Sequence, residues 1–130
     1  MGAGLIHEAA VNNVLLRDNK LKIKGFAKAV REIVSEEFLD DDVFKDSINI
    51  VPDAFKIIDG GHYDNCFTVV ICEVEDHSKI SSIKMQKIIN LWNFLDAESH
   101  ILELKVFDRF GNFVNTLEMI EYYHQSIIQG

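Results

Sequence analysis

Residues 51–75 read VPDAFKIIDGGHYDNCFTVVICEVE and largely decide the fold of this chain of 130 residues. The apolar, β-branched run at 66–75 is typical of a strand, and residues 53–58 form a second candidate strand. Between them, residues 59–65 are rich in Gly, Asp and Asn, which favour turns. The stretch therefore predicts an antiparallel β-hairpin.

Three acidic residues interrupt the apolar strands of this hairpin. Glu73 and Glu75 end the second strand and share one face, because side chains alternate along a strand. In a hairpin that is symmetric about Tyr63, Asp53 lies directly opposite Glu73. Opposed carboxylates destabilise a sheet unless something positive lies between them, and hard divalent cations prefer carboxylate oxygens. We therefore expect Asp53 and Glu73 to lie close enough to share one cation.

The rest of the chain shows alternating helical and strand patterns. A helix between Glu75 and Ile101 is long enough to join two parallel strands, so the sequence predicts an α/β domain with a mixed sheet and helices on both faces. The acidic run 40–42 is interpreted as a solvated loop. The predicted helices span 5–16, 26–39, 79–97 and 116–127. Ser78 is the expected N-cap of the third helix and Thr116 that of the fourth. The further predicted strands span 47–51 and 101–107. The apolar faces expected of the first and third helices are Leu5, Ile6, Ala9 and Ala10, and Ile80, Ile83, Ile88, Leu91, Trp92 and Leu95.

Composition indicates one globular domain. Apolar residues make up 48% of the chain and charged residues 26%, and no apolar run is long enough to cross a membrane. The first ten residues lack the basic and apolar regions of a signal peptide. Cys66 and Cys72 lie six positions apart on one predicted strand, too distant to pair, so we interpret both as reduced thiols in a cytoplasmic protein.

The net charge of −8 counts against a tight, free-standing DNA binder, because such proteins use Lys and Arg to contact phosphates. It does not exclude a nuclease, since an acidic metal site accounts for part of the charge and bound cations offset it.

The hairpin motif resembles that of the PD-(D/E)XK nuclease superfamily, whose core is restriction endonuclease-like. Pro52-Asp53 is followed by Glu73-Val-Glu75 on the next strand, and then by a helix and a strand. The predicted elements of 26–107 match the αβββαβ order of that core. The resemblance implies that Asp53 and Glu73 bind Mg²⁺ or Mn²⁺. Most members have Lys where this chain has Glu75, although some restriction endonucleases of the family have Glu there.

Two further kinds of residue are candidates for this site. Lys84 and Lys87 fall within the apolar stripe of the helix at 79–97, and Lys84 is nearer to Glu75; alternatively, both side chains extend to solvent at the edge of the stripe. The family often adds an acid from the first core helix, which here is Glu37 or Glu36, unless these acids are simply solvated. The predicted parts are an N-terminal helical extension (1–24), a nuclease-like core (25–110) and a C-terminal helix (111–130).

The resemblance implies a metal-dependent phosphodiester hydrolase, a nuclease that acts on DNA. The predicted catalytic residues are Asp53, Glu73, Glu75 and Lys84, with Asp53, Glu73 and Glu37 as metal ligands. Glu75 or Lys84 would orient or deprotonate the attacking water. The chain is too short to surround a duplex, which implies a homodimer or a partner protein. The alternative is a catalytically inactive protein of the same fold that acts as an acidic protein-interaction module or inhibitor.

Overall fold

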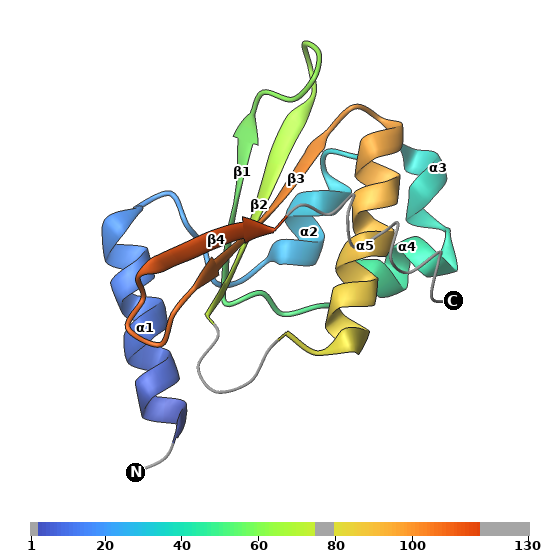
Figure 1. Cartoon of the computed structure of the whole chain (residues 1–130). Coiled ribbons are helices and arrows are strands. Elements are labelled where there is room, and N and C mark those ends of the chain that lie inside the picture. Colours follow the sequence, from blue (N-terminus) through green and yellow to red (C-terminus); the bar gives the residue numbers. More distant parts are fainter. Residues whose placement is uncertain (1–2, 75–79, 118–130) are drawn as a thin grey trace.

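The computed structural model describes residues 3–74 and 80–117 of the chain, as an α/β domain (Figure 1). Helices lie on both sides of one sheet. The elements are α1 (Ala3–Arg17), α2 (Phe26–Arg31), α3 (Glu36–Leu39), α4 (Asp42–Ser47), β1 (Ala54–Asp59), β2 (Phe67–Val74), α5 (Ser82–Ala97), β3 (Ile101–Phe107) and β4 (Phe113–Leu117).

The sheet is mixed, as predicted, and has the strand order β1-β2-β3-β4. The β1–β2 hairpin is antiparallel, α5 connects β2 to the parallel strand β3, and β4 returns antiparallel to β3. Ala54 pairs with Cys72 and Asp59 with Phe67. This is the register centred on Tyr63 that the sequence predicts, and continued by one residue it sets Asp53 opposite Glu73.

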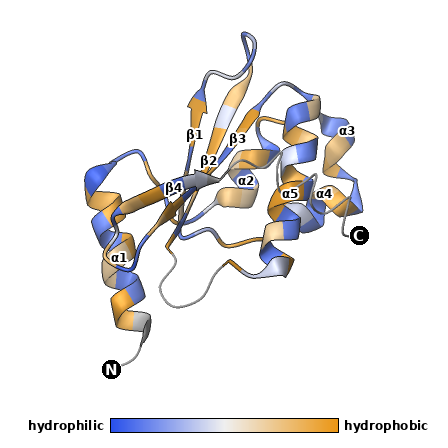
Figure 2. Ribbon diagram, in the orientation of Figure 1, coloured by the Kyte–Doolittle hydropathy of each residue, from blue (hydrophilic) through white to orange (hydrophobic). Residues whose placement is uncertain are grey.

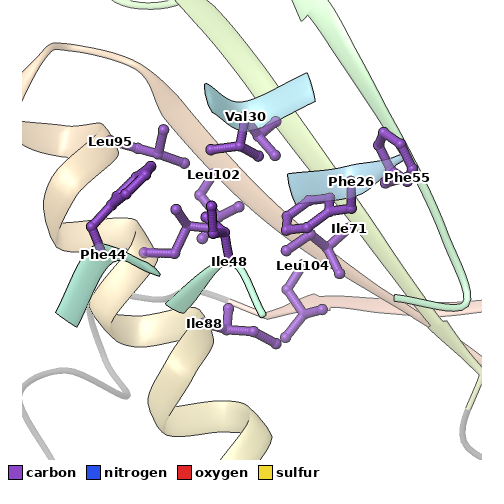
Figure 3. Close-up of a cluster of buried hydrophobic side chains, with 12 residues drawn as sticks. Phe26, Val30, Phe44, Ile48, Phe55, Ile71, Ile88, Leu95, Leu102 and Leu104 are labelled. Carbon is purple, nitrogen blue, oxygen red and sulfur yellow. The ribbon is translucent and has the colours of Figure 1, made fainter. Parts of the chain in front are cut away.

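The larger core lies between the sheet and α2, α4 and α5 (Figure 3). Val69 and Ile71 of β2 are fully buried there beside Leu104 of β3. Leu91 and Leu95 of α5 are also fully buried, which confirms the predicted inward face of this helix at those positions. In Figure 2, β2 is mainly hydrophobic, as expected for a strand covered on both faces.

A smaller cluster covers the other face of the sheet, where α1 packs. Val11 and Val14 of α1 are buried near Val74, and Cys72 is buried on the same face. The β3–β4 turn is attached to α1 by Arg17, whose guanidinium donates to the Gly111 carbonyl over 2.9 Å. The helix at 5–16 is thus confirmed, but its predicted apolar face is correct only at Ala10: Leu5, Ile6 and Ala9 are exposed, and the buried face is Ala10, Val11 and Val14.

The predicted helix at 26–39 is divided into α2 and α3. The Ser35 N–H donates to the Glu98 carboxylate over 2.9 Å, so it is not available to continue the helix that precedes it. A contact distant in sequence therefore overrides the helical pattern.

The acidic run 40–42 is exposed, as predicted, but it forms the junction between α3 and α4, and Asp42 is the first residue of α4. The Asp41 carboxylate accepts hydrogen bonds from the N–H groups of Val43 and Phe44 over 2.8 and 3.1 Å, as an N-cap does. The predicted strand at 47–51 is wrong, since Ser47 ends α4. Only two described strands therefore precede α5, where the αβββαβ core requires three.

Two helix boundaries also differ from prediction. Ser81 caps α5 by accepting from the Lys84 N–H over 3.1 Å, so the helix begins at Ser82, and Ser78 lies outside the described residues. Ile83 is exposed instead of facing the core. Thr116 pairs with Lys105 in β4 and is not an N-cap, because an additional strand completes the edge of β3. The remainder of the predicted helix at 116–127 lies outside the described residues.

Within the described ranges, no helix is long and apolar enough to cross a membrane.

Candidate functional site

Two acidic side chains interlock at the end of the hairpin opposite its turn. The Asp53 N–H donates to Oε2 of Glu73 over 3.0 Å. In return, the Val74 N–H donates to Oδ2 of Asp53 over 2.7 Å. Each carboxylate is thus held by the backbone of the neighbouring chain segment, so the strand register fixes the position of both acids.

Lys84 joins this acid pair from the first turn of α5. Its ammonium forms an ion pair with Oε1 of Glu73 and donates to the Val51 carbonyl over 2.8 Å. The Ser81 cap begins the helix at Ser82, which places Lys84 in the first turn of α5. Lys87, one turn further along, instead contacts Asp46 at 3.5 Å, away from Glu73. The structure thus brings Lys84, and not Lys87, to the two acids.

Glu73 is the most unusual group of the site. It is 3% exposed, and its pKa is raised from 4.5 to about 7. Burial is the main cause, because an ionised carboxylate loses its hydration there, and the charge of Asp53 raises the pKa further. The hydrogen bond and charge of Lys84 act in the opposite direction. Near neutral pH, Glu73 is therefore balanced between its charged and neutral forms.

His7 of α1 is a fourth member of this cluster, and the sequence interpretation missed it. Its Nε2 lies 2.8 Å from Oδ1 of Asp53. The available signal was helical spacing: His7 precedes Ala10, Val11 and Val14 at intervals of three, four and seven residues, which places it on the buried face of α1. The helix outside the predicted nuclease-like core therefore contributes to the site.

Asp53 and Glu73 are the residues of this cluster that could hold a hard divalent cation, since such ions prefer carboxylate oxygens. Each of the four carboxylate oxygens of Asp53 and Glu73 has one hydrogen-bonding or ionic partner, and a carboxylate oxygen offers two lone pairs. Among the described residues, no group of three His, Cys, Asp or Glu side chains is arranged to hold a metal. Two carboxylates nevertheless suffice for Mg²⁺, which usually binds one or two carboxylates and fills its remaining positions with water and substrate phosphate.

Glu37 and Glu36 are not brought to this cluster. They begin α3, where neighbouring Phe38 stacks against Phe94 with ring centroids 5.1 Å apart. Phe94 lies ten residues after Lys84 on α5, or about 15 Å along the helix axis. The predicted metal ligand Glu37 is thus near the far end of α5. Glu75 lies outside the described residues.

The two cysteines behave as the sequence predicts, since both are buried and unpaired. Burial raises the pKa of Cys72 to about 11, which keeps its thiol protonated and unreactive.

Comparison of the chain with protein-family models, with curated proteins and with solved structures finds no match. Any functional assignment therefore depends on the residues and geometry of the site itself.

Proposed function

We propose that the chain is a metal-dependent phosphodiester hydrolase that cleaves DNA, with a site similar to that of the PD-(D/E)XK nucleases. The interlocked Asp53 and Glu73, with Lys84 paired to the buried Glu73, are the observation that carries the proposal. Asp53 and Glu73 lie at one end of the hairpin and Lys84 in the first turn of α5, and this grouping supports the proposal.

The energetics of the cluster favour a functional role over a structural one. A buried ion pair recovers little more than the cost of removing its charges from water, and apolar side chains of similar volume often stabilise a fold as well or better. A strongly shifted pKa next to a charged partner is typical of functional sites. Glu73 has both properties, so stability alone is a poor reason for its presence.

Each residue has a defined part in this proposal. Asp53 and Glu73 would hold Mg²⁺ or Mn²⁺, which would supply Lewis acidity at the scissile phosphate and a water molecule of lowered pKa. Lys84 neutralises Glu73 and orients the phosphate or the water. Glu75 follows Glu73 by two positions and assists in deprotonating the water. A homodimer or a partner protein completes the DNA-binding surface.

The test is a cleavage assay on plasmid and oligonucleotide DNA with Mg²⁺, Mn²⁺ or Ca²⁺. The wild-type protein should cleave with Mg²⁺ or Mn²⁺ and poorly with Ca²⁺, whose looser coordination activates water less well. Glu73→Gln and Asp53→Asn should abolish turnover and the thermal stabilisation by Mn²⁺. Asp46→Asn is the matched control, since it removes an exposed carboxylate paired with Lys87.

The second candidate is an inactive protein of this fold that binds a protein partner through its acidic surface. The net charge of −8 favours it. Equal, metal-independent activity of wild type and Glu73→Gln would indicate contamination. Together with a stoichiometric partner retained in the presence of EDTA, that result would replace the nuclease proposal with the second candidate.

A further inference from the structure

The negative net charge of the chain conceals a separation of charge along the sequence. Residues 19–31 read NKLKIKGFAKAVR and contain five of the 13 Lys and Arg residues but no acid. Residues 32–46 contain seven acids and one lysine. A protein of this net charge that binds a polyanion must do so on a local basic surface, because charges separated by more than about 8 Å are largely screened at physiological salt.

The basic segment is fixed to the edge of the sheet beside the acid cluster. Its residues 19–25 lie in the connection between α1 and α2, much of which is hydrophilic (Figure 2), and its remaining residues form α2. Lys22 and Phe55 exchange two backbone hydrogen bonds of 2.8 Å each, which attach the segment to the outer edge of β1. Phe55 is two residues from Asp53, so the backbone of Lys22 lies about 9 Å from that of Asp53.

A hollow of about 390 Å³ opens between this segment and β1. Lys20, Lys22 and Lys56 line it, together with the apolar side chain of Ile57. Because β1 begins next to Asp53 and the hollow includes its residues 55–58, the hollow follows the edge of the sheet away from the acid cluster.

The lysines of this segment are available to a ligand. Lys56 lies on β1, outside the segment, and it is already paired with Asp18 at 2.6 Å. This hydrogen bond is the main cause of the lowered pKa of Asp18. Lys22, Lys24 and Lys28 are exposed and form no ion pair with any acid in the part of the chain that the structure describes. A local excess of positive charge therefore remains.

We propose that the exposed lysines of 20–28 form a binding surface for the sugar–phosphate backbone of DNA, on one side of the scissile position. This surface, here called the β1-edge basic surface, consists of Lys20, Lys22, Lys24 and Lys28. The inference rests on the proposed nuclease function, because the acid cluster defines the scissile position. Phosphates repeat every 3.4 Å of duplex axis in each strand, so a backbone separation of about 9 Å brings Lys22 within reach of a phosphate a few nucleotides from the one cleaved.

The alternative, a basic surface that is only solvated, explains the exposure of the lysines but not their arrangement. Solvated lysines are usually interspersed with acids, whereas this surface has none within its segment. The lysines also lie beside the one described cluster that pairs a buried carboxylate with a charged neighbour. Most of the acidic residues of 32–46 lie on or between α3 and α4. Phe38 and Phe44 of these helices pack against Phe94 of α5, so these acids belong to a different part of the fold from the basic segment.

The experiment measures binding of the full chain to a short labelled DNA duplex by fluorescence anisotropy, in Ca²⁺ and over a series of salt concentrations. The slope of log K against log salt is negative, and Lys22→Gln/Lys24→Gln should reduce its magnitude by about 2. Each lost phosphate contact reduces the magnitude by about 1. The expected loss of affinity at low salt is about tenfold or more. Lys24→Gln/Lys28→Gln, which leaves the residue bridged to Phe55 unchanged, should have a similar effect.

The matched control is Lys45→Gln/Arg109→Gln, which removes two exposed positive charges outside the surface and should leave the slope unchanged. A loss in this control equal to that in Lys22→Gln/Lys24→Gln would overturn the proposal, as would an absence of salt-dependent binding in the wild-type protein. Binding of anionic phosphatidylserine vesicles in place of DNA, dependent on Lys22 and Lys24, would overturn it in favour of a membrane.

Failure of the nuclease proposal is detected separately. If Glu73→Gln and wild type show the same metal-independent background but the lysine variants still change the slope, the basic surface is supported and the chemistry is wrong. If cleavage requires Glu73 and the lysine variants bind like wild type, the chemistry is supported and the basic surface is wrong.

Discussion

The buried polar groups at the two ends of the β1–β2 hairpin have different kinds of partner. At the turn end, His100 is 5% exposed, and both ring nitrogens have backbone partners. Nδ1 accepts from the Phe67 N–H over 2.9 Å, which leaves Nε2 to donate to the Ile33 carbonyl over 3.1 Å. At the other end, the equally buried Glu73 has a charged partner in Lys84.

This difference separates a structural polar group from a candidate functional one. Both ring nitrogens of His100 are satisfied, so it connects β2 to the segment between α2 and α3 and has no capacity left for a ligand. Glu73 has a pKa near 7 and lone pairs that its two partners leave free. Burial of a polar residue is therefore a poor guide to function, whereas the charge and remaining bonding capacity of its neighbourhood distinguish the two ends.

Removal of Lys84 should cause the largest change in the free energy of unfolding. Lys84→Met leaves the ionised Glu73 buried without its cation and should reduce the free energy of unfolding by about 3 kcal/mol above neutral pH. Glu73→Gln/Lys84→Met should recover most of that loss. Lys87→Met is the control, and because its partner Asp46 is well exposed, it should cost less than about 0.5 kcal/mol. Urea denaturation of the four proteins measures these differences, and equal losses for both lysines would contradict the contrast.

Removal of His100, at the turn end of the hairpin, should reduce the free energy of unfolding by a smaller amount. His100→Ala leaves the Phe67 N–H and the Ile33 carbonyl without partners, which should cost roughly 2 kcal/mol. Metal-dependent stabilisation should be unchanged, since the substitution does not affect the acid cluster. Thermal denaturation with and without Mn²⁺ tests both statements, with exposed His62→Ala as the control. Loss of the Mn²⁺ response in His100→Ala would show that the two ends are not independent.

The pH dependence of stability should show a graded effect that is smaller for each pH unit. The folded-state pKa of Glu73 is raised from 4.5 to about 7, so folding favours its protonated form. Its contribution to stability is complete below pH 4.5 and is lost as the pH rises through about 7. The free energy of unfolding in EDTA should therefore fall over this interval, by less than about 1.4 kcal/mol per pH unit. Glu73→Gln should remove this component, and identical pH profiles for the two proteins would refute the assignment.

Local sequence was sufficient to predict the hairpin and most of the residues at its end. A turn centred on Tyr63 between two apolar runs determines the register, and the register alone sets Asp53 opposite Glu73. The helical phase brought Lys84 to the same place, because Ile88, Leu91 and Leu95 fix which side of α5 faces the sheet.

The remaining features depended on contacts that a local pattern does not contain. The Ser35–Glu98 hydrogen bond interrupts the helix at 26–39, and β4 forms because β3 offers it an unpaired edge. His7 was missed because its partner Asp53 lies 46 residues away. Helical spacing places it on the face of Ala10, Val11 and Val14, whereas the apolar pattern of the sequence favours the face of Leu5, Ile6, Ala9 and Ala10.

The closeness in sequence of Asp53, Glu73 and Lys84 has a consequence for the order of folding. Closing the short turn at 60–66 costs less chain entropy than closing the connection at 75–100 that pairs β2 with β3, so we expect the hairpin to form first. The two acids then meet before α5 delivers its lysine, and their repulsion opposes this early step. Added salt should therefore accelerate refolding of the wild-type chain in stopped-flow measurements, and Asp53→Asn should lose most of that acceleration.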